Sequence, residues 1–134
     1  MLTREFRTRQ LQRFADSALT LRLYANDITP TGEETTAAFE EVRGGGYAPI
    51  PLDPASWTVR AHPPTASADP APSAQTPTAT YPRATFAFTG AAGLVHGYYV
   101  THEGLVVEAQ RFPDGPYEIR RDGEDIKVSL TIQG

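Results

Sequence analysis

The last third of the chain, residues 81–134, is a run of short apolar segments separated by turns rich in glycine, proline and aspartate. Strands are expected at residues 85–89, 94–101, 105–112 and 126–132. The turns between them are expected at 90–93, 102–104, 113–116 and 122–123. Closely spaced short strands joined by such turns are typical of antiparallel β-proteins. The chain is therefore predicted to be all-β.

Alternating side chains support this class outside the last third as well. Leu19, Leu21 and Leu23 alternate with more polar residues, a period of two that puts the leucines on one buried face. The clearest alternation in the chain is at residues 126–132. Residues 47–52 can be extended, but two prolines there remove ladder donors, so this segment is expected at a sheet edge.

Two further patterns refine the architecture. Residues 94–100 and 105–109 are apolar at consecutive positions, as in central strands that are covered on both faces. Thr31 followed by Glu34 matches a capping box and predicts one or two helical turns over residues 33–41, which the neighbouring threonines weaken. Many short strands and no long helix predict an antiparallel β-sandwich that resembles a jelly roll.

Length and charge exclude several classes of protein. A chain of 134 residues is expected to form one domain with its own core. Its net charge of −4 argues against nucleic acid as a partner, and no apolar run is long enough to span a membrane. Cysteine is absent, which excludes disulfides and thiolate metal sites. The first residues have arginine without an apolar stretch behind it, so no signal peptide is expected.

Residues 61–82 are dominated by Pro, Ala, Ser and Thr. Such a composition cannot build a core and predicts a long exposed loop that leans toward polyproline II. Two small domains joined by a linker are the competing interpretation, which we reject because neither half could hide the apolar faces of its strands alone. We expect a single β-sandwich domain over residues 18–134 with this loop inserted in it.

Residues 1–17 form a polar and basic segment that precedes this domain, and its arginines are Arg4, Arg7, Arg9 and Arg13. Apolar residues are sparse, so the segment is predicted to be an extended or partly helical arm that cannot hold a fixed place alone. One interpretation is a frayed terminus with solvating charges. The other is an arm whose four arginines bind carboxylates on an acidic partner.

No catalytic, cofactor or metal site is expected. His96 and His102 lie near Glu103 and Glu108, but no pair has the spacing that places metal ligands on one strand face. The carboxylates around residues 118–125 are typical of solvated charge. No nucleophile elbow or phosphate-binding loop is present. The protein is therefore predicted not to be an enzyme.

The adjacent Tyr98 and Tyr99 are the aromatic candidates for binding a partner. On a strand they point to opposite faces, so one of them could be exposed as an interface anchor. The alternative is a tyrosine at the rim of the sandwich that bonds its hydroxyl to the backbone.

Several short segments, taken together, carry a family resemblance. In the first half they are residues 21–30, with Leu-Tyr-x-Asn-x-x-Thr-Pro at 23–30, then Phe39, 46–48, Trp57 and Thr58. In the second half they are 86–90, 95–101 with Gly-Tyr-Tyr-Val at 97–100, 108–112, 114–117 and 125–128. This pattern covers most of residues 19–132 and resembles small virion proteins of tailed bacteriophages. Residues 61–82 and the arginine arm depart from the pattern, so the resemblance implies no role for them.

The resemblance implies a structural protein of the phage particle, assembled in the host cytoplasm. Decoration or cement proteins of phage capsids are commonly small β-sandwiches that bridge neighbouring capsomers. We therefore expect a decoration protein that binds the major capsid protein or other virion proteins, as a homo-oligomer. The runner-up is a head-to-tail connector, tail or baseplate protein. A carbohydrate-binding module, in which exposed aromatics stack on sugars, is an alternative of a different class.

Overall fold

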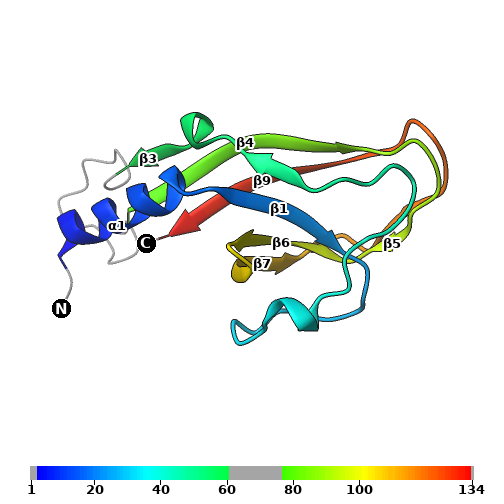
Figure 1. The fold of residues 1–134 in the computed structure, drawn as a ribbon, viewed down its shortest axis with the longest axis horizontal. Helices are drawn as coiled ribbons and strands as arrows, with labels where there is room; N and C mark the ends of the chain where they lie inside the picture. The colour runs from blue at the N-terminus through cyan, green and yellow to red at the C-terminus, as the bar shows by residue number, and fades with distance from the viewer. Residues whose placement is uncertain (1–2, 61–76, 134) are drawn as a thin grey trace. The chain divides into compact units, whose positions relative to one another are not determined.

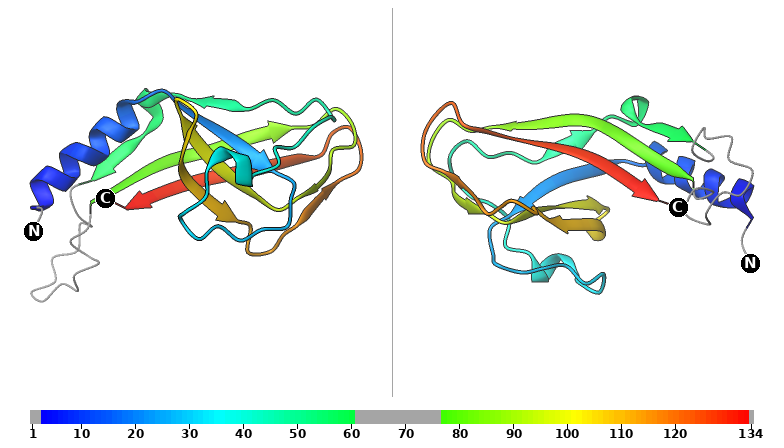
Figure 2. Two further views of the ribbon diagram at one scale, coloured as in Figure 1. Left: turned by 60° about the horizontal axis from the view of Figure 1, so that its bottom comes forward. Right: turned by 180° about the vertical axis from the view of Figure 1, so that it is seen from behind.

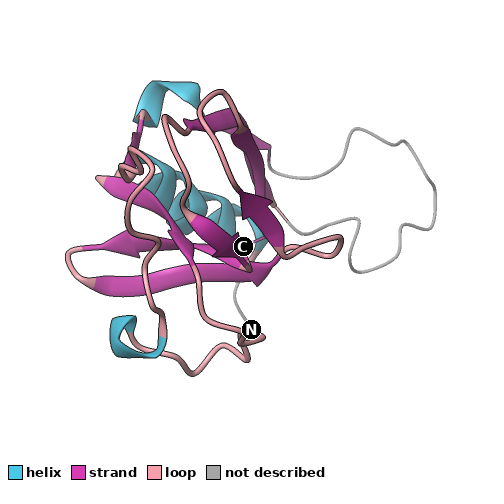
Figure 3. Cartoon of the chain, turned by 90° about the vertical axis from the view of Figure 1, so that its right-hand side faces the viewer, coloured by secondary structure: helices cyan, strands magenta, loops and turns pink. Residues whose placement is uncertain are grey.

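The computed structural model describes residues 3–60 and 77–133, which are mostly strand and turn with one long helix (Figure 3). The pairs β1–β2, β1–β6, β6–β7, β3–β4 and β5–β8 are antiparallel. The predicted all-β class is confirmed at this level. The elements in chain order are α1 (Arg4–Asp16), β1 (Leu19–Tyr24), η1 (Thr36–Ala38), β2 (Ile50–Leu52), η2 (Pro54–Ser56), β3 (Thr58–Arg60), β4 (Thr78–Ala87), β5 (Gly93–Val95), β6 (Gly97–His102), β7 (Leu105–Arg111), β8 (Tyr117–Ile119) and β9 (Asp125–Gln133).

The chain forms two compact units. Unit 1 comprises Met1–Ser17, Asp53–Ala84 and Val128–Gly134, and unit 2 comprises Ala18–Leu52 and Thr85–Lys127. Strands β4 and β9 contribute residues to both units. This grouping differs from the predicted boundaries, because α1 belongs with residues 53–84. A single domain over residues 18–134 remains a prediction.

Strand β1 is central in the four-stranded sheet of unit 2, whose order is β2-β1-β6-β7 (Figure 2). Leu19, Leu21 and Leu23 are at most 2% exposed, which confirms their predicted burial. The short β2 lies at the edge of this sheet, as its prolines predicted. The alternation in β9 is also confirmed, because Ile126, Val128 and Leu130 are buried between exposed neighbours.

Beyond the end of β2, residues 40–42 take over the backbone pairing along the same edge of β1. Ala25 N–H donates to Glu40 O at 2.7 Å, and Val42 N–H donates to Leu23 O at 3.0 Å. Of the one or two helical turns predicted within residues 33–41, the structure contains one, the 3-10 turn η1, whereas residues 40–41 are extended along β1. The segment gains ladder hydrogen bonds to β1, which a helix would forgo. The carboxylate of Glu34 does accept hydrogen bonds from the N–H and hydroxyl of Thr31, as half of a capping box.

The predicted strand at residues 94–101 divides at His96. Strand β5 pairs with β8, a strand that the sequence did not reveal, whereas β6 pairs with β1 and β7. Gly97 begins β6 at a close approach: a Cβ there would lie 2.6 Å from Tyr24 Cε1 and closer still to Gln110 O. Only glycine fits between these groups, which explains the glycine that precedes the two tyrosines.

Helix α1 of unit 1 replaces the predicted extended arm (Figure 1). The Thr3 hydroxyl accepts a hydrogen bond from Phe6 N–H at 3.2 Å and caps the helix. Leu11 is 5% exposed and Ala15 is fully buried, while the Phe14 ring contacts Trp57 edge to face at 6.1 Å. The expectation that this segment holds no fixed place is wrong, because the stripe at 11, 14 and 15 has β3 and η2 as neighbours.

The predicted loop over residues 61–82 extends too far at its C-terminal end. Residues 78–82 belong to β4, where Thr78, Ala79 and Thr80 pair with β3, and Pro77 is fully buried. The β-branched Thr78 and Thr80 and the aromatic Tyr81 favour a strand despite Pro82. Residues 61–76 of that prediction lie outside the described residues.

Replacing Leu11 with alanine tests whether α1 is part of the fold. Because Leu11 is almost fully buried, we expect Leu11→Ala to lower the free energy of unfolding by about 2–5 kcal/mol. Urea denaturation followed by the fluorescence of Trp57, the single tryptophan, measures the change. The matched control is Gln10→Ala on the exposed side of the helix, which should be nearly neutral. Equal stability of both variants would show that α1 is an arm after all.

Candidate functional site

A hollow within unit 2 lies over one face of β1 and β6. It encloses about 620 Å³ and is lined by polar side chains, among them Arg22, Glu41 and Thr101, and by residues 36–40. Strand register explains the setting, because Arg22 pairs with Tyr99 and Thr20 pairs with Thr101, so these side chains share a face.

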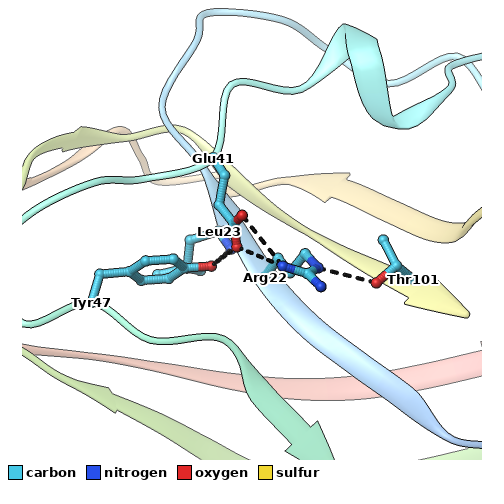
Figure 4. A network of polar contacts seen from close by, with 5 residues as sticks. All are labelled: Arg22, Leu23, Glu41, Tyr47 and Thr101. Atoms are coloured by element: carbon cyan, nitrogen blue, oxygen red, sulfur yellow. Dashed lines mark hydrogen bonds and ion pairs between the residues drawn. The ribbon is translucent and has the colours of Figure 1, made fainter. Parts of the chain in front are cut away.

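A polar network joins Arg22 to three other side chains at this hollow (Figure 4). Its Nη1 donates to both carboxylate oxygens of Glu41 at 3.3 and 3.1 Å, and its Nε donates to Thr101 Oγ1 at 3.1 Å. The Tyr47 hydroxyl donates to Glu41 Oε2 at 2.7 Å and accepts from Leu23 N–H at 3.1 Å. Arg22 and Glu41 are each 31% exposed, so the pair is largely withdrawn from water.

The surroundings of Tyr47 keep its hydroxyl protonated. Burial, followed by the hydrogen bond to Glu41, raises the pKa of Tyr47 far above its usual range. Tyr47 therefore stays protonated and remains a donor to the Glu41 carboxylate, which Arg22 neutralises. Each of these polar groups has a partner within the protein, and together they brace the edge of β1.

An aromatic cluster borders the same face of the sheet. The Phe39 and Tyr99 rings are stacked at 4.6 Å, and Tyr24 lies 5.1 Å from Phe39. Ile28, Ala38, Val106 and Ala109 pack against these three rings. The cluster fixes residues 28–39 onto the sheet and thereby forms one wall of the hollow.

Tyr98 and Tyr99 lie on opposite faces of β6, as predicted, but both are buried, at 7% and 4% exposure. The expectation that one is an exposed anchor is therefore wrong. Tyr98 packs against Phe112, and its hydroxyl lies 3.4 Å from Gln110 Oε1 rather than on the backbone. Burial raises the pKa of Tyr98 to about 12. Both rings are occupied by internal packing: Tyr99 packs against Phe39, in a covering segment at 28–39 that the sequence did not reveal, and Tyr98 packs against Phe112.

The predicted partner-binding arginines of α1 whose side chains the structure describes are divided between two sides of the helix. Arg7 is half-buried, and its Nε is enclosed without a hydrogen-bond partner among the described residues. Arg9 pairs with Glu5 at 3.1 Å on the open side of the helix, and Arg13 is exposed in the last turn. The side chain of Arg4 lies outside the described part of the chain. Helical spacing therefore separates Arg7 from Arg9 and Arg13, which share the exposed side of the helix.

The histidines and carboxylates have separate partners. The buried His96 Nδ1 lies 2.8 Å from Ala25 O, and His102 Nδ1 lies 3.1 Å from Ala18 O. Glu124 accepts the backbone N–H groups of residues 120 and 121. Within residues 3–60 and 77–133, no three His, Cys, Asp or Glu side chains are grouped as metal ligands. His62 lies outside the described residues.

Sequence reasoning missed the Arg22, Glu41 and Tyr47 network. Its members are separated by 19 and 25 positions from Arg22, and no local spacing links them. The folding of residues 40–42 onto β1 brings them together. No short pattern in the sequence signals that step.

Comparison of the chain with protein families, curated proteins and solved structures found no match. Among the described helices, none has the length and apolar character needed to cross a membrane.

Removing the Tyr47 hydroxyl tests the bracing role of the network. Tyr47→Phe leaves Leu23 N–H without its acceptor and Glu41 without a donor. We expect the free energy of unfolding to fall by about 1–3 kcal/mol in urea titrations. Tyr117→Phe, at a half-buried tyrosine on β8, is the control and should change stability little. A neutral Tyr47→Phe would show that water replaces the hydroxyl without cost.

Glu108 on β7 provides a pH-dependent test. Burial raises the pKa of its carboxyl group, so its ionised form is less stable in the folded than in the unfolded protein. The folded state therefore gains relative stability as the pH falls and this carboxyl group is protonated. Glu108→Gln should be more stable than the parent chain at pH 7, with the difference shrinking at pH 4. Urea titrations at both pH values measure it, with the exposed Glu33→Gln as control. A Glu108→Gln variant that is less stable at pH 7 would contradict this account.

Proposed function

We propose that the protein is a structural component of a tailed-phage particle, and specifically a capsid decoration protein that bridges major capsid subunits. One observation carries the proposal. The two halves of the phage-protein resemblance pair directly in one sheet: Leu23 lies opposite Tyr98, and Tyr24 lies opposite Gly97. Because these residues are far apart in sequence, their pairing supports a resemblance that extends to the core of the fold.

The burial of these residues also supports the proposal. Leu23, Tyr24, Tyr98, Tyr99 and Val100 are all at most 7% exposed. The buried part of the pattern describes a scaffold, and the partner-specific contacts then belong to exposed side chains. This arrangement suits a protein whose work is to bind neighbours in a particle rather than to transform a substrate.

The finer architecture is part of this proposal. We propose an antiparallel β-sandwich of jelly-roll type. The alternate burial along β9, where every second side chain is buried, is typical of a strand with one face in a core. Sandwiches of this kind are common among proteins of viral particles.

The partners that we propose are the major capsid protein, or another virion protein, and further copies of this chain. The particle would be assembled in the host cytoplasm. A neck, tail or baseplate position is the second candidate and differs only in where on the particle the chain binds. The buried state of Trp57, Tyr98 and Tyr99 leaves no specific observation in favour of a carbohydrate-binding module.

Electron microscopy of particles tests the proposal. Purified protein is mixed with capsids of its own phage that lack minor proteins, and bound protein is separated by sedimentation. We expect regular density on every capsomer and a bound amount that saturates in proportion to capsomer number. Capsids of an unrelated phage are the control and should bind none. Binding only at the portal vertex or tail would replace the decoration role with the second candidate, and no binding to any particle would overturn both.

A further inference from the structure

The two units of the chain carry opposite charge. Unit 1 holds six arginines and four carboxylates, a formal charge of +2, whereas unit 2 holds six cationic side chains and twelve carboxylates, a formal charge of −6. Together they give the net charge of −4 for the whole chain. Unit 1 of one copy is therefore attracted to unit 2 of another, while like units repel each other.

The exposed face of α1 presents apolar and cationic side chains together. Phe6, Arg9 and Arg13 follow an i, i+3, i+7 spacing and share the side of the helix opposite to the buried Leu11 and Ala15. Phe6 is 49% exposed. Arg9 has only the exposed pair with Glu5, and Arg13 has no ion pair within the described part of the chain. Exposed pairs of that kind are weak, so both arginines are available to a partner.

The end of unit 2 near β7 presents the matching combination. Leu105 and Val107 are 68% and 38% exposed. They are two of the four large hydrophobic side chains that are exposed among the described residues. Glu103, in the turn before β7, has a side chain that is 82% exposed. An acidic group beside two apolar ones complements an aromatic ring beside two arginines.

The backbone at this edge disfavours the alternative of strand addition. Opposite β6, the register shifts between Val100 and Thr101, so Val107 is an extra residue that interrupts the ladder of β7. Pro51 removes a donor at the other edge, in β2. Both edges of the sheet are thus poor templates for another strand, and side chains are the means of contact that remain.

From these observations we propose that the protein associates head to tail. The α1 face of one copy, Phe6 with Arg9 and Arg13, binds the β7 surface of a second copy, which is Glu103 with Leu105 and Val107. Such a contact is heterologous, and it closes into a ring or extends as a chain. The inference rests on the self-association included in the proposed function and assigns the surfaces that produce it.

Sedimentation equilibrium of the full chain tests this contact. We expect concentration-dependent association that weakens at least about 10-fold between 50 mM and 500 mM salt, because the arginine–carboxylate attraction is screened. Phe6→Ala and Arg13→Glu should each weaken association by about 10-fold or more. The matched control is Leu94→Ala, which removes an equally exposed apolar side chain of unit 2 on β5, and it should associate as the parent chain does. Circular dichroism verifies that every variant is folded.

A charge exchange distinguishes this contact from others. Arg13→Glu and Glu103→Arg should each be impaired alone, whereas an equimolar mixture should recover association, because the altered helix of one then meets the altered β7 surface of the other. A mixture that stays as impaired as its components would overturn the proposal, as would a chain that remains monomeric at low salt. If the monomeric chain still binds capsids and Phe6→Ala abolishes that binding, the α1 face belongs to the capsid protein instead. Self-association without capsid binding would uphold this inference and refute the proposed function alone.

Discussion

Strand β1 has to satisfy backbone polar groups on two edges while its leucines are withdrawn from water, and the organisation of unit 2 follows from this requirement. Strand β6 pairs with one edge from Thr20 to Tyr24. On the other edge β2 pairs only as far as Leu21, and the next groups are completed by residues 40–42 and by the Tyr47 hydroxyl. Unpaired buried N–H groups are costly, so these substitutes are necessary for the fold.

The brace that completes this edge also shapes the face above it. Glu41 pairs with Arg22 and accepts a hydrogen bond from the Tyr47 hydroxyl. These contacts hold the segment that contains Phe39, whose ring stacks on Tyr99. The hollow and the aromatic cluster are thus consequences of how one strand edge is satisfied. The polar groups of this face are bonded to one another, so exposed side chains elsewhere are the better candidates for recognition: the helix face at Phe6 and the apolar pair on β7.

Elements determined by local pattern were predictable from the sequence. The leucines of β1, the proline-bearing edge strand β2 and the alternation of β9 were all recognised, because a period of two or a missing donor has the same meaning in any context. Elements determined by partners were not. Helix α1 depends on Trp57, which is more than forty residues away. The strand divides at His96 because its first part pairs with β8 and its second part with β1 and β7. The network around Arg22 depends on the pairing of residues 40–42 with β1, which no local pattern in the sequence indicates.

Amide hydrogen exchange measured by NMR tests the central claim most directly, namely that Tyr47 and residues 40–42 complete the edge of β1. The account predicts that the amides of Leu23, Ala25 and Val42 are protected to a degree similar to amides of β6, because each donates to a group inside the fold. Exchange of these three amides at the rate of an open chain, with β6 still protected, would show that the edge of β1 is unsatisfied and would contradict the account.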